Sequence, residues 1–142
     1  MKDWTNYQNE TYGDDVCKLL IEFLDNYKID NAIDLECGSG NETVYMIKNG
    51  IKVLAIDRQL NQDFILNRLS DSEKRLISFK KSSFEDVELP KTKLLTAFFS
   101  IPFCNPNNFD ELWTKIYNSI EIPIPQVNIV RCKYDNDSNL IG

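Results

Sequence analysis

The chain has 142 residues, the length of one domain, and its 42% hydrophobic and 27% charged residues are typical of a folded globular protein. It contains no histidine, so catalytic triads, cysteine–histidine pairs and metal sites that depend on histidine are excluded. Its net charge of −6 argues against general binding to nucleic acid, because an acidic chain gains little from releasing counterions at phosphates.

The sequence carries no signal for a membrane or for export. Its apolar runs are far shorter than the ~20 residues that a membrane-spanning helix needs, and the first residues lack the apolar segment of a signal peptide. The four cysteines are scattered without a C-x-x-C pair, so we expect free thiols and no metal site. These features predict a cytoplasmic protein.

Helices are expected to alternate with strands along the chain. The first helix follows the turn at Gly13, with Asp14 or Asp15 as its N-cap, and its apolar residues recur at spacings of three and four up to Tyr27. Apolar runs predict strands over 32–35, 51–56, 76–79, 94–99 and 127–132. Helices are predicted from 41 to the stop signal at 49–50, over 62–69, and from about 108. This alternation predicts a single α/β domain, 1–142, with a mostly parallel sheet covered on both faces.

A glycine-rich turn follows the first predicted strand. There Asp34 precedes Gly38 and Gly40, and glycines allow the backbone to pass close to a ligand. The second strand ends in Asp57, where an acid can accept both hydroxyls of a ribose. A plain turn and a solvated strand end would explain either feature alone, but their joint occurrence in this order favours a nucleoside cofactor.

The spacing of the glycines argues against a dinucleotide. The fingerprint G-x-G-x-x-G requires a third glycine, and Thr43 stands at that position. Asp34, inside the strand end, suits a ligand with a positively charged amino group better than one with two phosphates.

The motifs resemble those of class I S-adenosylmethionine-dependent methyltransferases, and in particular small bacterial members, some akin to the tellurite-resistance type. The resemblance covers about residues 14–120 and implies a Rossmann-like, doubly wound sheet. It rests on 33–43 (IDLECGSGNET), 53–57 (VLAID), 83–86 (SFED), 98–103 (FFSIPF) and the helix at 109–116.

The resemblance implies a role for each matching residue. The amino-acid part of the cofactor would lie against Asp34, Glu36, Gly38 and Gly40, and the ribose against Asp57. Ser83, Phe84 and Glu85 would lie beside the adenine. The methyl group and the substrate would be flanked by Ser100, Pro102 and Phe103.

Methyl transfer is compatible with the absence of histidine. The reaction is an in-line displacement at a sulfonium, and it depends mainly on holding the nucleophile and the methyl group aligned. The acceptor is expected to be a small molecule. Residues 100–103 (SIPF) lack the Asn/Asp-Pro-Pro-Tyr/Phe pattern expected for amino groups of bases or glutamine.

Two departures from the family pattern keep alternatives open. Glu36 stands where the family usually has glycine, so its carboxylate either pairs with the cofactor or obstructs it. Residues 121–142 lose the family pattern, which predicts a C-terminally truncated fold without its last strands and with an exposed sheet edge that favours a homodimer. The alternatives are a non-catalytic remnant of the fold, a nicotinamide-dependent oxidoreductase and an acidic interaction module.

Overall fold

The computed structural model describes residues 16–35, 37–83, 86–97, 109–120, 129–132 and 140–141. The strands are β1 (Asn31–Leu35), β2 (Lys52–Asp57), β3 (Ile77–Lys81), β4 (Leu95–Ala97), β5 (Ile129–Cys132) and β6 (Leu140–Ile141). The helices are α2 (Lys18–Asn26), α3 (Asn41–Lys48), α4 (Gln62–Leu66) and α5 (Phe109–Ser119), with a 3₁₀ helix, η1 (Glu73–Leu76). The predicted alternation of helices and strands is confirmed.

The strands form one sheet in the order β3-β2-β1-β4-β5-β6. All neighbouring pairs are parallel except β5 and β6, which are antiparallel. The order reverses at β1, because the chain runs outward from β1 to β3 and then crosses back to β4. The sheet is therefore Rossmann-like and mostly parallel, as predicted.

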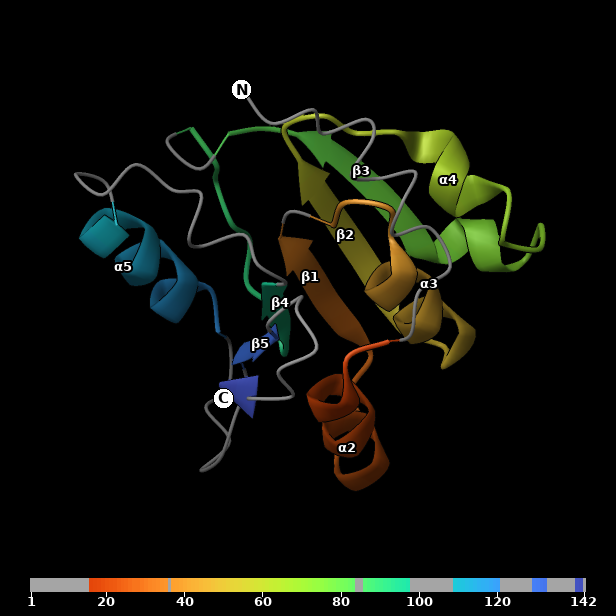
Figure 1. The fold of residues 1–142 in the computed structure, drawn as a ribbon, viewed down its shortest axis with the longest axis horizontal. Helices are drawn as coiled ribbons and strands as arrows, with labels where there is room; N and C mark the ends of the chain where they lie inside the picture. The colour runs from red at the N-terminus through yellow and green to blue at the C-terminus, as the bar shows by residue number, and fades with distance from the viewer. Residues whose placement is uncertain are drawn as a thin grey trace.

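Helices cover both faces of this sheet (Figure 1). One core contains the apolar residues of α2, α3 and α4 together with Ala32, Val53 and Ala55 of the strands. The other contains residues of α5 and the alternate strand positions, Ile33 and Ile56 among them. Because successive side chains of a strand point to opposite faces, burial on both faces requires the nearly continuous apolar runs seen in the sequence.

The helix α4 is shorter than the predicted segment 62–69. It ends at Leu66. The N–H of the C-cap Asn67 still donates four residues back, to Asp63, whereas those of Arg68 and Leu69 donate to carbonyls three residues back. The Nε of Arg68 donates to the Phe64 carbonyl oxygen at 2.7 Å, and this carbonyl is the partner that the Arg68 N–H would have in a continuing helix. The Arg68 side chain thus takes over a helical acceptor where the helix stops.

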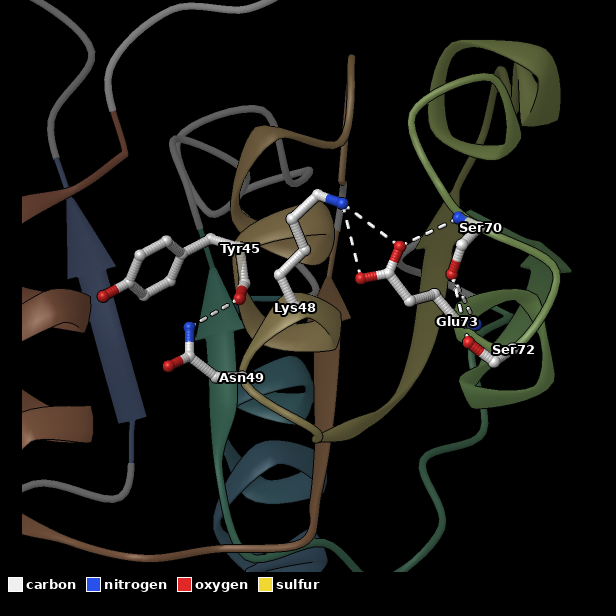
Figure 2. A network of polar contacts seen from close by, with 6 residues as sticks. All are labelled: Tyr45, Lys48, Asn49, Ser70, Ser72 and Glu73. Carbon is white, nitrogen blue, oxygen red and sulfur yellow. Dashed lines mark hydrogen bonds and ion pairs between the residues drawn. The ribbon is translucent and has the colours of Figure 1, made fainter.

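The turn that leads into η1 was not predicted. Ser70 and Glu73 exchange hydrogen bonds, with Ser70 N–H to Glu73 Oε1 at 2.8 Å and Glu73 N–H to Ser70 Oγ at 3.2 Å, the reciprocal pattern of a capping box. Figure 2 shows Lys48 at the end of α3 reaching the same carboxylate, with its Nζ 3.1 and 3.3 Å from the two oxygens. These contacts tie α3 to the segment before β3.

The sequence predicts a fold without its last strands. Among the described residues, β5 is followed by one strand of two residues, β6. Cys17 is disulfide-bonded, so the expectation of four thiols is wrong at this residue, whereas the buried Cys37 is in no disulfide. In the part of the chain that the structure describes, no helix has the length and apolar character needed to span a membrane.

Candidate functional site

The candidate site lies where the strand order reverses. In a doubly wound sheet, ligands bind beyond the carboxyl ends of the strands at such a switch point. Here β1 lies between β2 and β4, and the loop that leaves the carboxyl end of β1 leads directly into α3 (Figure 1). Both predicted glycines lie in this loop, and Asp57 ends the neighbouring strand β2.

The glycine loop is a tight turn in a left-handed conformation. Gly38 and Gly40 have φ angles of 57° and 83°, which glycine adopts without the penalty that a Cβ would add. The Gly40 N–H donates to the Cys37 carbonyl oxygen at 2.8 Å, and this bond closes the turn. A Cβ at Gly40 would also clash with the side chain of the buried Ile65 in α4. Gly40 is thus required both by its backbone angle and by its neighbour.

Asp57 joins the end of β2 to this loop. Its Oδ2 accepts the Gly38 N–H at 2.7 Å, and its Oδ1 accepts the Gln59 N–H at 3.0 Å. The side chain is buried, yet each carboxylate oxygen has more than one acceptor position. Acceptor capacity for hydroxyl groups therefore lies next to the glycine loop.

Asp34 is almost completely buried. Only 1% of it is exposed, and its two oxygens accept the hydroxyl of Thr43 at 2.5 Å and the hydroxyl of Thr96 at 2.8 Å. Burial raises the pKa of Asp34 to about 6, although both hydroxyl groups counteract this shift. Asp34 thus connects β1 with α3 on one side and β4 on the other.

Glu42 is a third buried acid, and the sequence reasoning missed it. Its Oε2 accepts the N–H of Cys17 at 3.3 Å, so it links the first turn of α3 to the residue before α2. Burial, and then the negative charge of Asp34, raise the pKa of Glu42 to about 8. Glu42 is therefore mainly uncharged near neutral pH.

The predicted adenine side is described only at Ser83. The preceding residue, Ser82, donates its N–H to the Asp57 carbonyl oxygen at 3.1 Å, so this segment runs beside the end of β2. The Ser83 hydroxyl donates to Asp86 Oδ2 at 3.1 Å and accepts the Asp86 N–H at 3.3 Å. The structure therefore brings Asp34, Gly38, Gly40, Asp57 and Ser83 to one edge of the sheet.

Six predicted site residues lie outside the described residues. They are Glu36, Phe84, Glu85, Ser100, Pro102 and Phe103.

Three further residues around the loop were not predicted. Thr96 stands next to Asp34 in the register of β1 and β4, so correct strand pairing would have revealed it. In the sequence Thr43 stands out only because the dinucleotide fingerprint requires glycine at its position, and in the structure its hydroxyl donates to Asp34. Arg68 donates to Ser39 and Asn41 from a distant turn, and no sequence pattern marks it. In the described ranges, no three cysteine, aspartate or glutamate side chains converge as a metal site would require.

Comparison with solved structures places this arrangement among known folds. The structure superposes on a Methanococcus maripaludis protein assigned as an S-adenosyl-L-methionine-dependent methyltransferase, with a TM-score of 0.71 and 12% identity over 94% of this chain and 65% of that one. The chain has the methyltransferase fold.

Other methyltransferase structures share this fold. The glycopeptide N-methyltransferase MtfA in complex with S-adenosyl-L-methionine matches with a TM-score of 0.65 and 14% identity, over 84% of this chain and 55% of that one. A Listeria monocytogenes protein assigned as an S-adenosylmethionine-dependent methyltransferase matches with a TM-score of 0.56 and 20% identity, over 80% and 52%. The chain thus spans between about half and two thirds of the length of these structures. No family model and no curated protein matches the sequence.

Proposed function

We propose that the chain binds S-adenosylmethionine at the carboxyl edge of β1 and β2 and transfers its methyl group to a small-molecule acceptor. The observation that carries this proposal is the bond between Asp57 and the Gly38 N–H, which joins a hydroxyl-accepting carboxylate to a glycine turn at the switch point of the sheet. The solved methyltransferases with the same fold support the general kind of reaction.

The described residues fit this cofactor. Gly38 and Gly40 have no Cβ that would obstruct the approach of a ligand to the loop, and the remaining acceptor positions of Asp57 suit a ribose diol. When bound, the cofactor would supply an electrophilic methyl group on a sulfonium. In our proposal the loop and Asp34 support its amino-acid end, and Ser83 lies toward the adenine, with Phe84 and Glu85.

The protein's own task in such a reaction is mainly positioning. Because displacement at a sulfonium neutralises charge, the site has to align the acceptor and exclude water rather than supply a strong base. We propose Ser100, Pro102 and Phe103 for this alignment. The absence of histidine from the chain then costs the reaction little.

Calorimetric titration with S-adenosylhomocysteine tests the proposal. We expect binding with a dissociation constant in the micromolar range, which corresponds to about −8 kcal/mol. NADH serves as the control for the oxidoreductase alternative, because that alternative requires the dinucleotide to bind. Heat from NADH and none from S-adenosylhomocysteine would contradict the methyltransferase proposal.

Glu36→Gly distinguishes an active enzyme from a non-catalytic remnant. If the glutamate obstructs the cofactor, the variant binds S-adenosylhomocysteine and the unsubstituted chain does not. If the glutamate pairs with the cofactor, the variant binds more weakly than the unsubstituted chain. The two readings thus predict opposite signs for the change in affinity.

We propose the cytoplasm as the compartment and a homodimer formed through a sheet edge as the assembly. A disulfide at Cys17 is unusual in a reducing compartment and weighs against the first proposal. Counting the thiols of the denatured protein, isolated from its native cells with its thiols blocked at lysis, tests it, since a reducing compartment predicts four thiols per chain. Sedimentation of the same sample measures whether the chain dimerises.

A further inference from the structure

Arg68 lies outside the predicted motifs but reaches back to the glycine loop. It stands in the turn after α4, and its guanidinium donates to the carbonyl oxygen of Ser39 and, at 2.8 Å, to Oδ1 of Asn41. Its Nε donates to the Phe64 carbonyl oxygen at 2.7 Å, which fixes the direction of the side chain. One planar group thus connects the turn after α4 to the loop and to the first residue of α3.

The Ser39–Gly40 peptide is consequently held at both ends. Its carbonyl oxygen accepts from Arg68, and its N–H donates to the Cys37 carbonyl oxygen at 2.8 Å. Ile65, one turn before Arg68, occupies the space beside Gly40 that a Cβ would fill. The helix α4 and its following turn therefore support the loop from outside the loop's own sequence.

The position of the Arg68 guanidinium does not stabilise α3. The guanidinium lies beside the first turn of α3, where the positive end of the helix dipole disfavours positive charge. The charge of Arg68 lowers the pKa of Glu42, against the larger effect of burial, but this interaction does not require the guanidinium to donate to Ser39 and Asn41. What the contact provides is a fixed orientation of the peptide at the centre of the glycine loop.

We propose that Arg68 is a positioning residue that orients the glycine loop for the amino-acid end of the cofactor. This inference rests on the proposed function, since it assigns a task at the same site. Its distinctive consequence is selectivity within the ligand: loss of Arg68 weakens contacts with the amino-acid end and leaves the nucleoside end nearly unchanged.

Two ligands that differ only at that end test the inference. S-adenosylhomocysteine carries the amino-acid group, whereas 5′-methylthioadenosine retains the nucleoside and lacks that group. For Arg68→Met we expect an affinity for S-adenosylhomocysteine lower by about tenfold to a hundredfold, the effect of losing one or two hydrogen bonds between the loop and the charged amino-acid end. The affinity for 5′-methylthioadenosine should change by less than about threefold.

Two variants control for other causes. Arg68→Lys keeps the charge but loses the planar fork, so its affinity for S-adenosylhomocysteine should lie between those of the unsubstituted chain and Arg68→Met. Arg75→Met removes an exposed arginine of η1 and should leave both affinities unchanged. Circular dichroism confirms that each variant is folded before titration.

The outcomes separate this inference from the proposed function. Equal losses for both ligands, or no loss for either, overturn the positioning role while the unsubstituted chain still binds S-adenosylhomocysteine. A selective loss with intermediate affinity for Arg68→Lys supports it. Failure of the unsubstituted chain to bind S-adenosylhomocysteine overturns the proposed function, and the inference with it.

Discussion

Two glycines with nearly the same backbone angle have different neighbours. Gly40 and Gly50 have φ angles of 83° and 81°, but a Cβ would clash with Ile65 at Gly40 and would meet nothing within 4 Å at Gly50. Alanine at Gly50 should therefore cost only the backbone strain, about 1–2 kcal/mol, and leave ligand binding unchanged. Alanine at Gly40 should cost more and remove binding of S-adenosylhomocysteine.

Urea denaturation and calorimetry of both glycine variants measure these effects. Gly50→Ala is the matched control, because it carries the same strain without the steric clash. Equal stabilities and equal affinities for the two variants would show that the contact with Ile65 has no consequence for the loop.

Asp57 should be the single side chain on which nucleoside binding depends most. Asp57→Asn keeps an oxygen for the Gly38 N–H but loses the charge and the second acceptor oxygen, which accepts the Gln59 N–H. We expect affinity for S-adenosylhomocysteine to fall by about tenfold to a hundredfold, with a similar loss for 5′-methylthioadenosine. Asp63→Asn, an exposed acid in α4, is the control and should bind as the unsubstituted chain does. Loss for one ligand only would contradict the role of Asp57 at the ribose.

The sequence predicts the residues of the glycine loop and of the strand ends, but not the residues that hold them in place. Asp34 lies near the end of β1, Gly38 follows that strand and Asp57 ends β2. These positions are recognisable because a ligand at a switch point needs open backbone and acceptors there. Thr96 becomes a partner of Asp34 only through strand register, which depends on the whole sheet. Arg68 contacts Ser39 across 29 positions, and nothing local in the sequence encodes that distance.

At the scale of elements, the carboxylate of Glu73 has two partners that we expect to contribute unequally to stability. It accepts the Ser70 N–H at 2.8 Å and pairs with Lys48, whose side chain is half exposed (Figure 2). The Ser70 N–H, and then Lys48, hold the pKa of Glu73 below its usual value. Exposed ion pairs contribute little to stability, whereas the reciprocal bonds with Ser70 define the turn into η1.

We therefore expect the two partners to respond differently to substitution. Lys48→Met should lower Tm by less than about 2 °C, and Glu73→Ala by several degrees more. Differential scanning calorimetry at low and high salt measures both changes. High salt should remove most of the Lys48 effect, but only the small part of the Glu73 effect that comes from the same ion pair. Equal decreases in Tm for the two variants would indicate that the ion pair, and not the turn, accounts for the contribution of Glu73 to stability.

The elements predicted best are those whose pattern reflects burial. The strands β1 and β2 lie within a residue of their predicted bounds, since burial on both faces gives an uninterrupted apolar run. The helix α4 was predicted too long because the side chain of Arg68 replaces a backbone donor, a tertiary effect. The helix η1 was missed because a single turn leaves no apolar period.

For the whole molecule, two buried acids make stability depend on pH. Asp34 and Glu42 have pKa values raised to about 6 and about 8, mainly by burial. Both values exceed those of the unfolded chain, so between pH 4 and pH 8 these two groups bind more protons in the folded state than in the unfolded state. The stability that they contribute must then decrease as pH rises through this range, because each acid has to ionise inside the protein.

Glu42→Gln removes one of these acids and should flatten the decrease. The amide oxygen can still accept the Cys17 N–H, but no charge develops as pH rises. Relative to the unsubstituted chain, the variant should gain roughly 2–4 kcal/mol of unfolding free energy between pH 4.5 and pH 8, given about 1.4 kcal/mol per pKa unit at a buried group. Near pH 4.5 it should be no more stable than the unsubstituted chain, because Glu42 is then uncharged.

Urea denaturation at a series of pH values measures this difference. Glu22→Gln is the matched control, because Glu22 is exposed in α2 and its substitution should leave the pH profile unchanged. Residual pH dependence in Glu42→Gln below about pH 6 is then assigned to Asp34, which lies among Thr43 and Thr96. Parallel profiles for Glu42→Gln and the unsubstituted chain would mean that Glu42 ionises in the folded state as readily as in water, which its burial makes unfavourable.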